Sequence, residues 1–379
     1  MATIAITGIS GFLGQRVHEQ LRADGHTVVG VDLRPPADAE GLVFHEADVR
    51  SRPDVERALA HVDGVVHLAT ATRAGMPDHS VNVGGSQVVV DAAVAAGVDT
   101  LVVMSSAMVY GAHPDNSVPL GEDAPLRADP DFTMAAQKVM LEHMVAPLLD
   151  ADQGPRTVVL RPAMVVGADA DNLLTRALQG SRLLAVKGHT PPVQFVHVDD
   201  VAAAIALAVR SDMAGAYNVA CEGWLASDEL RSLLHHRVLE VPEEIAFTAT
   251  DRSHAMGLSR LPASALPWVM WPWVVAVDRL LEAGWQPSIS NRDAAALLAA
   301  EQAATVSLAG VEADRATVRR AGIAVGMVGG VLAIGALARR RRAAPSAAGP
   351  GEGRDGGDGR DDGDGGDTGH GGTGEGGSP

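Results

Sequence analysis

The sequence predicts an α/β protein built on a doubly wound parallel sheet, and three observations support this fold class. Short β-branched runs alternate with longer amphipathic stretches over the first two hundred residues. A glycine-rich turn, TGISGFLG (Thr7–Gly14), directly follows the first of these runs, and Asp32 closes the second. Strands that are separated by helices form parallel sheets whose two faces are covered.

The expected elements follow one another in a regular order. Strands are predicted at Thr3–Thr7, Thr27–Asp32, Val65–Leu68, Leu101–Ser105 and Thr157–Leu160. Helices are predicted at Gln15–Ala23, Val81–Ala96 and Met134–Leu149. After Gly167 the rhythm loosens, with a strand at Val193–Val198, a helix at Asp199–Arg210 and a strand at Ala216–Ala220. We therefore expect a sheet domain over residues 1–165 with returning segments at 193–220, and a smaller C-terminal lobe over residues 166–300.

The last part of the chain has a different composition. Residues 321–338 carry no charge and would form a helix about 27 Å long, enough to cross a bilayer, so we predict a transmembrane helix there. Gly322, Gly326 and Gly330 recur on one face of it, which favours close pairing of two helices. Residues 343–379 are rich in Gly and Asp and are expected to be disordered.

A tryptophan-rich stretch, Leu266–Pro287, holds four of the five tryptophans. It indicates either packing within the smaller lobe or anchoring at a membrane interface. The two alternatives stay open at the level of the sequence.

The overall charge narrows the possible partners. The formal net charge is −17, which argues against a nucleic-acid-binding protein. The single cysteine, Cys221, excludes an internal disulfide and suits a reducing compartment. The opening residues show no basic region and no cleavage site, so no signal peptide is expected and the folded domain should be cytoplasmic, attached to the membrane by its C-terminal helix.

The glycine-rich turn predicts a dinucleotide site of the Rossmann type. Its glycines permit a tight turn and a close approach of a ligand, and the following helix offers free N–H groups to a pyrophosphate. The residues expected to contact the cofactor here are Gly8, Gly11, Phe12, Leu13 and Gly14. The Asp32 carboxylate would bind the ribose hydroxyls and repel a 2′-phosphate, so NAD is favoured over NADP, although Arg34 stands nearby.

Further motifs follow in order: ADV (Ala47–Val49), VVHLAT (Val65–Thr70), NVGGSQVVVDAA (Asn82–Ala93), VVMSSAMVYG (Val102–Gly111), LRPAMVVG (Leu160–Gly167), FVHVDDVA (Phe195–Ala202) and GWQP (Gly284–Pro287). Through these motifs the chain resembles the extended short-chain dehydrogenase/reductases of the NAD-dependent epimerase/dehydratase family. The resemblance implies that residues 1–165 bind NAD and that the smaller lobe binds substrate. It also implies that Asp48 and Val49 contact the adenine, that Leu68 and Ala69 line the cofactor, and that Ser106 and Lys138 serve the reaction.

The sequence departs from this family at its central catalytic position. The family carries a tyrosine four residues before the lysine, and here Met134 stands there. A thioether cannot exchange a proton. Thr133 is one position out of register on the helix, and Tyr110 and Tyr217 match tyrosines that are non-catalytic in the family, so none of them is an obvious replacement.

The resemblance leaves three functions open. The first is an NAD-dependent epimerase, dehydratase or oxidoreductase that acts on a nucleotide sugar or a related, lipid-linked sugar by transient hydride transfer. The second is a catalytically weakened, membrane-anchored NAD-binding protein with a regulatory or scaffold role. The third is a membrane-anchored enzyme similar to hydroxysteroid dehydrogenases, which normally keep the tyrosine. A homodimer is expected in each case.

The candidate ligands for phosphate and metal are few. Relatives that bind a sugar diphosphate usually place an arginine just before the FVHV strand, and Val193 occupies that place here. Arg161 and Arg182 are the alternative cations, with Arg161 expected to be structural. No metal site is predicted, because His67 lies in a motif where histidine is ordinary, and His235 and His236 are adjacent and would diverge.

Overall fold

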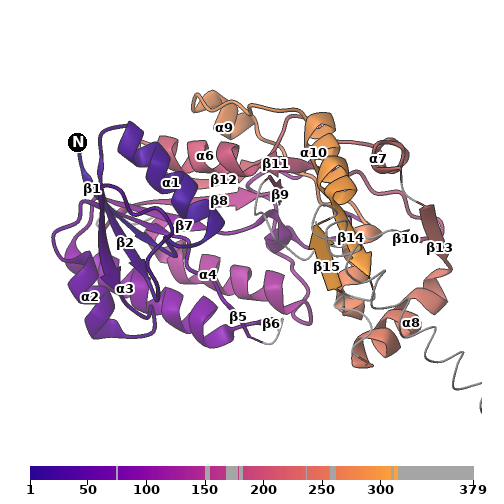
Figure 1. Cartoon of the computed structure of the whole chain (residues 1–379), viewed down its shortest axis with the longest axis horizontal. Coiled ribbons are helices and arrows are strands. Elements are labelled where there is room, and N and C mark those ends of the chain that lie inside the picture. The colour runs from indigo at the N-terminus through magenta and orange to yellow at the C-terminus, as the bar shows by residue number, and fades with distance from the viewer. Residues whose placement is uncertain are drawn as a thin grey trace, which may run out of the picture. The chain divides into compact units, whose positions relative to one another are not determined.

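A computed structural model describes residues 1–73, 76–149, 154–167, 178, 182–235, 237–256, 262–308 and 311–314, and Met1–Ala316 form one compact unit (Figure 1). The predicted transmembrane helix at 321–338 and the predicted disordered tail at 343–379 lie outside the described residues. Within the described part of the chain, no helix is both long enough and apolar enough to cross a bilayer.

The main sheet has seven strands in the order β12-β8-β7-β4-β1-β2-β3, and every neighbouring pair is parallel. The strands are β1 (Thr3–Thr7), β2 (Thr27–Asp32), β3 (Leu42–Glu46), β4 (Gly64–His67), β7 (Thr100–Met104), β8 (Arg156–Pro162) and β12 (Gly215–Val219). The order reverses direction at β1, which is the signature of a doubly wound fold. The predicted Rossmann-like parallel sheet is therefore confirmed.

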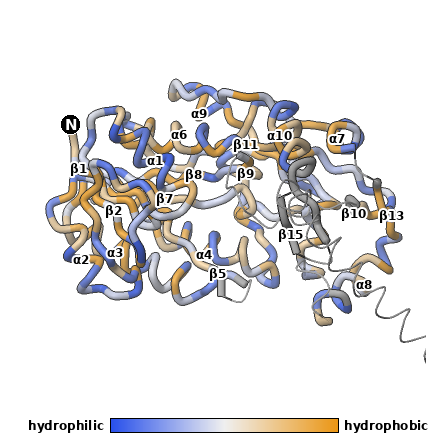
Figure 2. The backbone as a smooth tube through the Cα atoms, in the orientation of Figure 1, coloured by the Kyte–Doolittle hydropathy of each residue, from blue (hydrophilic) through white to orange (hydrophobic). Residues whose placement is uncertain are grey.

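Helices cover both faces of this sheet (Figure 1). One face carries α1 (Phe12–Ala23) and α6 (Val198–Arg210), and the other carries α2 (Arg52–Leu59), α3 (Ser86–Ala96) and α4 (Thr133–Leu149). Successive side chains of β1 point to opposite faces of the sheet, and each face has its own layer of helices. Ile4 and Ile6 pack with α1 and α6, whereas Ala5 packs with α2 and α3. Figure 2 shows that the strands around β1 and β2 are mostly hydrophobic, as expected for strands that are buried on both sides.

The remaining elements form the loops around the sheet and the smaller lobe. They are β5 (Thr72–Arg73), β6 (Met76–Pro77), a π-helical turn η1 (Ser80–Gly85), a 3₁₀ turn η2 (Ala107–Tyr110), β9 (Met164–Val166), β10 (Arg182–Val186), β11 (Phe195–His197), α7 (Ser227–Leu234), β13 (Arg237–Val241), α8 (Glu243–Ala255), a 3₁₀ turn η3 (Ala263–Val269), α9 (Asp278–Glu282), α10 (Asn291–Ala304), β14 (Thr305–Leu308) and β15 (Val311–Asp314). In the smaller lobe β9 pairs with β11, and β10 pairs with β13.

Several expected boundaries differ from the structure. The edge strand β3 was not expected, since its burial is only partial and it lacks a strong apolar run. The stretch expected as one helix at Val81–Ala96 is divided into η1 and α3. The strand expected at Val193–Val198 is shorter, because Val198 already begins α6.

The tryptophan-rich stretch packs inside the unit. Trp268, Trp273 and Trp285 are 5%, 7% and 3% exposed. Trp268 and Trp273 meet edge to face, with ring centroids 5.2 Å apart, and belong to a core that also contains Phe132. Of the two alternatives for this stretch, burial of these three side chains favours packing over membrane contact.

Candidate active site

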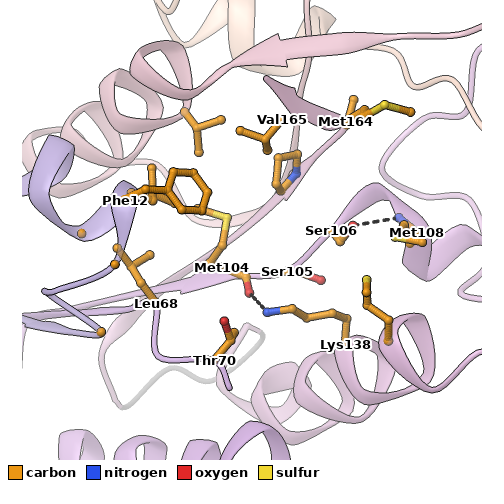
Figure 3. Close-up of a pocket in the computed structure, with 18 of the residues that line it drawn as sticks. Phe12, Leu68, Thr70, Met104, Ser105, Ser106, Met108, Lys138, Met164 and Val165 are labelled. Carbon is orange, nitrogen blue, oxygen red and sulfur yellow. Dashed lines mark hydrogen bonds between the residues drawn. The ribbon is translucent and has the colours of Figure 1, made fainter. Parts of the chain in front are cut away.

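A cavity of about 370 Å³ opens at the carboxyl ends of the central strands. It begins at the turn after β1 and extends past the ends of β2, β4, β7 and β8. Ligands of doubly wound proteins bind at this edge, where the strand order reverses. Figure 3 shows the cavity between α1 and α4, with Phe12 and Leu68 at one end and Ser106, Met108 and Lys138 at the other.

The cavity brings most of the predicted site residues together. Those that line it are Gly8, Gly11, Phe12, Leu13, Gly14, Asp32, Leu68, Ser106, Met134 and Lys138. Half of them come from the turn after β1 and the first residues of α1, and the others from the end of β2, from just after β4, from just after β7 and from α4. We call the part near Gly8 and Asp32 the cofactor end, and the part near Ser106 and Met134 the reacting end.

The glycine-rich turn is shaped by close backbone contacts. Gly8 has a φ of +76°, and a Cβ there would lie 2.8 Å from the Ala69 nitrogen. A Cβ at Gly14 would lie 2.4 Å from the Gly8 oxygen. Any side chain would therefore push the turn apart, and α1 begins immediately behind it at Phe12, with no acidic residue in its first turn. The free N–H groups of that turn suit a pyrophosphate.

Asp32 is held in a fixed position at the end of β2. Its carboxylate accepts hydrogen bonds from the Ser10 N–H at 3.0 Å and the Leu33 N–H at 2.7 Å. Two backbone donors leave the remaining lone pairs of the carboxylate for the hydroxyls of a ribose. The glycine-rich turn and the Asp32 carboxylate together fit NAD, the cofactor that the resemblance implies.

Three predicted cofactor residues do not line this cavity. Asp48 is paired with Arg50, which donates to it from both the backbone and the side chain, and this pairing lowers the pKa of the Asp48 carboxyl. Val49 is buried against Gly85, and Ala69 lines a neighbouring smaller cavity. The contacts of Asp48 and Val49 with an adenine stay a prediction.

The two serines after β7 have different roles in the structure. Ser105 is buried and its hydroxyl donates to Glu142 Oε1 at 2.5 Å. Ser106 is partly exposed to the cavity, and its Oγ accepts a hydrogen bond from the Met108 N–H at 3.2 Å (Figure 3). The Ser106 hydroxyl proton can therefore turn toward a ligand, whereas the Ser105 hydroxyl is committed to the protein.

Lys138 reaches the cavity from α4 and is anchored at one point. Its Nζ donates to the Met104 carbonyl oxygen at 2.7 Å (Figure 3). Burial lowers the pKa of Lys138 to about 8, although the Glu142 carboxylate acts in the opposite direction. Met134 lies one helical turn earlier and also lines the cavity, so a thioether borders the lysine where the family has a phenol.

Neither tyrosine lines the cavity. The Tyr110 hydroxyl donates to Asn218 Oδ1 at 2.8 Å and accepts from Arg161 Nη1 at 2.7 Å, and burial raises its pKa to about 12. Tyr217 lies on β12 in the core between the sheet and α6. Arg161 forms a buried ion pair with Glu142 at 2.6 Å, so this arginine has the structural role that was expected of it.

A smaller cavity of about 200 Å³ adjoins Lys138 on the side of α3. His67 contributes to it and is fixed between two hydroxyls, with Thr7 Oγ1 at 2.7 Å from Nδ1 and Ser86 Oγ at 2.8 Å from Nε2. Ser86 in turn donates to the Asn82 carbonyl oxygen, so His67 carries its proton on Nε2. Burial, and secondarily the charge of Lys138, lower the pKa of His67 to about 3.

Of the other candidate ligands, the two that are described, Val193 and His235, do not line the cavity. Val193 pairs with the backbone of Leu225 at a distance from it, the side chain of Arg182 and all of His236 lie outside the described residues, and His235 ends α7. Among the described residues, no group of three His, Cys, Asp or Glu side chains converges on a point.

Several lining residues were not predicted from the sequence, and three of them contribute large side chains to the reacting end. They are Met108 on η2, Met164 on β9 and Trp273 in the smaller lobe. All three are apolar, and no local motif distinguishes them from ordinary core residues. Only the folded chain brings them to Ser106.

The sequence matches the NAD dependent epimerase/dehydratase family over residues 4–220. The chain therefore belongs to this family of extended short-chain dehydrogenase/reductases, and its cofactor is NAD. Both predictions made from the motifs are confirmed.

Individual relatives are more distant. An uncharacterized protein, y4nG, of Sinorhizobium fredii is 29% identical over 76% of each chain. A UDP-glucose 4-epimerase of Neisseria meningitidis is 30% identical over 46% of this chain and 56% of its own length. The match thus spans little more than half of that epimerase.

A solved structure shows the same fold. The UDP-glucose 4-epimerase of Thermus thermophilus, solved in complex with NAD, has a TM-score of 0.61, with 23% identity over 80% of this chain and all of its own. This likeness extends beyond the main sheet to the part of the chain that holds the smaller lobe.

Proposed function

We propose that this chain is an NAD-dependent enzyme that exchanges a hydride with a carbon bearing a hydroxyl or carbonyl group, as an epimerase, a dehydratase or an oxidoreductase. One observation carries the proposal. Ser106 and Lys138 line the same cavity as the glycine-rich turn and Asp32, so one ligand-sized space joins a cofactor cradle to two polar groups of the family's reaction.

Ser106 orients the substrate oxygen. Because its Oγ accepts the Met108 N–H, its own proton is available for donation to a carbonyl or hydroxyl oxygen in the cavity. Lys138 has three N–H donors, and only one of them is used by the Met104 carbonyl in the described structure. Of the other two, one suits a hydroxyl of the nicotinamide ribose and one a substrate oxygen. When bound, NAD takes up a hydride from the substrate carbon and can return it.

Lys138 also takes the place of the missing tyrosine as the proton carrier. Besides Asp32 at the far end, it is the only ionisable side chain among the described residues that line the cavity. Its pKa of about 8 lies close to the pH of a neutral solution, which is the range where general acid–base catalysis is efficient. The neutral amine accepts the proton of an alcohol, and the ammonium returns it to a carbonyl oxygen.

The family relationship suggests a nucleotide sugar, or a lipid-linked relative of one, as the substrate. One of the two named relatives and the solved neighbour are UDP-glucose 4-epimerases, which supports this class. The competing hypothesis is a weakened NAD-binding protein with a regulatory role. The one observation that supports this competing hypothesis is Met134 at the position of the family's tyrosine.

The experiment is a hydride-exchange assay. The full chain, saturated with NAD, is incubated with sugar nucleotides and with simple secondary alcohols. NADH formation is followed by its absorbance, and epimerised or dehydrated products, which leave no net NADH, are identified by chromatography. We expect turnover that is lost in Ser106→Ala and Lys138→Met, while Ser106→Ala keeps the NAD affinity of the unmodified chain. If no substrate reduces NAD and none is epimerised or dehydrated although NAD binds tightly, the regulatory hypothesis replaces the enzymatic one.

The cellular setting is a separate proposal that rests on the sequence. The segment 321–338 anchors the chain to a membrane, and two copies form a dimer. Exposed apolar side chains on α3 and α4, Val94 and Met140, support a contact between copies. A full-length chain that stays in solution after a detergent-free high-speed spin would refute the anchor, and light scattering of the purified chain tests the dimer.

A further inference from the structure

The reacting end is lined by apolar side chains from four separate segments. Met108 comes from η2, Met134 from α4 and Met164 from β9, and Trp273 comes from the smaller lobe. These residues are distant in the sequence, and only the fold brings them together beside Ser106.

The tryptophan presents only its ring to this space. Its Nε1–H donates to the Trp268 carbonyl oxygen at 3.2 Å, and its ring is held edge to face by the Trp268 ring. The one polar atom of Trp273 is therefore used inside the protein. Its ring forms a fixed apolar wall, whereas the flexible thioethers of the same cavity can adapt to ligands of different shape.

The polar groups at this end are few. Among the described lining residues they are Ser106, Ser105, Thr70 and Lys138, and the Ser105 hydroxyl is already given to Glu142. The buried Arg161 is neutralised by Glu142 and does not line the cavity. Among the described lining residues, the side chains left for a ligand at this end are thus the Ser106 and Thr70 hydroxyls and the Lys138 amine.

These contacts point to a particular kind of substrate. We infer that the reacting carbon belongs to an apolar skeleton, a hydrocarbon ring system or chain with a single hydroxyl or carbonyl oxygen at Ser106, and not to a sugar ring. This inference rests on the proposed hydride exchange and specifies its substrate. It favours an apolar substrate over the nucleotide sugar that the relatives suggest.

The energies support this choice. A sugar ring brings several hydroxyls, and each one buried without a partner costs about 1–3 kcal/mol. A hydrocarbon skeleton instead gains roughly 25 cal/mol for each Å² of apolar surface that leaves water. Both effects act in the same direction at a surface made of thioethers and an indole ring.

The test compares two probes on the full chain saturated with NAD. The first is 2-decalol, two fused hydrocarbon rings with one secondary hydroxyl, and the second is UDP-glucose. Binding is measured by titration calorimetry and by the fluorescence of Trp273 and its neighbours. We expect 2-decalol to bind at least tenfold more tightly than UDP-glucose. Equal or tighter binding of UDP-glucose, or binding of neither probe, overturns the inference.

A pair of variants locates the binding site. Met134→Gln replaces the thioether with a polar group of similar size and should weaken 2-decalol binding about tenfold. Met140→Gln on the same helix is the control, because Met140 is 46% exposed and lies outside the cavity. Unchanged 2-decalol affinity in Met134→Gln also overturns the inference.

The same samples separate this inference from the proposed function. If 2-decalol binds as expected but no NADH forms from it, the apolar class stands and the proposed hydride exchange fails. If UDP-glucose binds more tightly and is turned over, the hydride exchange stands and the apolar class fails.

Discussion

The two ends of the cavity are built in different ways. The cofactor end depends on Gly8, Gly14 and Asp32, which act through backbone geometry and one carboxylate close to β1 and β2. The reacting end is assembled from η2, α4, β9 and the smaller lobe, and its lining includes three methionines, Met108, Met134 and Met164. Backbone geometry tolerates almost no substitution, whereas a wall of side chains can change its chemistry one residue at a time. This difference explains how a chain can keep NAD while the site beside it departs from the family pattern.

The largest expected effect is at the reacting end. Met134→Tyr places a phenol one helical turn from Lys138 and should raise turnover of any substrate that the hydride assay identifies. Restored general acid–base catalysis corresponds to a gain of about 10²–10⁴ in rate. Steady-state kinetics checks this, with Met140→Tyr as the control on the same helix. A lower rate in Met134→Tyr would show that the methionine belongs to a mechanism of its own.

The second prediction concerns the buried ion pair between Arg161 and Glu142. Arg161→Met leaves Glu142 buried without its partner, and we expect a loss of about 3–5 kcal/mol in the free energy of unfolding. Arg57→Met is the control, because its ion pair with Asp54 lies at the surface and should contribute less than about 1 kcal/mol. Urea denaturation measures both. Equal losses would mean that the buried pair has no special role.

The third prediction tests the cofactor end. Gly14→Ala puts a Cβ 2.4 Å from the Gly8 oxygen, and the shifted turn should weaken NAD binding by roughly tenfold to a hundredfold, as expected for a strain of about 1–3 kcal/mol. Gly84→Ala is the matched control, since a Cβ there meets open space. Calorimetric titration with NAD compares the two. Similar affinities in both variants would show that the turn does not hold the pyrophosphate.

The two ends also differ in how far the sequence predicts them. The strand, turn and helix around Gly8–Gly14 could be predicted because each depends on residues close together in the chain. Asp32 could be placed because the end of a strand fixes where its last side chain lies. Met108, Met164 and Trp273 could not, since their meeting depends on how η2, β9 and the smaller lobe fold together. The edge strand β3 was missed for a related reason, because partial burial leaves it without a clear apolar pattern.

The fourth prediction concerns the preference of the cofactor end for NAD over NADP. Asp32 should repel the 2′-phosphate of NADP, so the unmodified chain should bind NAD more tightly. Asp32→Ala should narrow this preference by about tenfold, which corresponds to about 1.4 kcal/mol. Asp32→Asn removes the charge but keeps one oxygen, which can accept from either the Ser10 or the Leu33 N–H group, so it preserves more of the local structure than Asp32→Ala does. Equal affinity of the unmodified chain for both cofactors would contradict this role.

The smallest expected effect is a dependence of stability on pH that arises from Lys138. Burial lowers its pKa from the ordinary 10.5 to about 8, so between these values the unfolded chain binds a proton at this site that the folded chain does not. Stability therefore rises with pH in this range, by about 1 kcal/mol between pH 8 and 9. The Cys221 thiol increasingly opposes the rise as the pH approaches its ordinary pKa of 9.0, because burial raises its pKa to about 12 and the unfolded chain then loses the proton first. The measurement is thus confined to pH 8–9, where urea denaturation of the unmodified chain is compared with that of Lys138→Met.

We expect the rise in stability with pH to be absent in Lys138→Met. A rise that persists in this variant would mean that Lys138 titrates at its ordinary pKa, and it would remove Lys138 as the proton carrier of the reacting end.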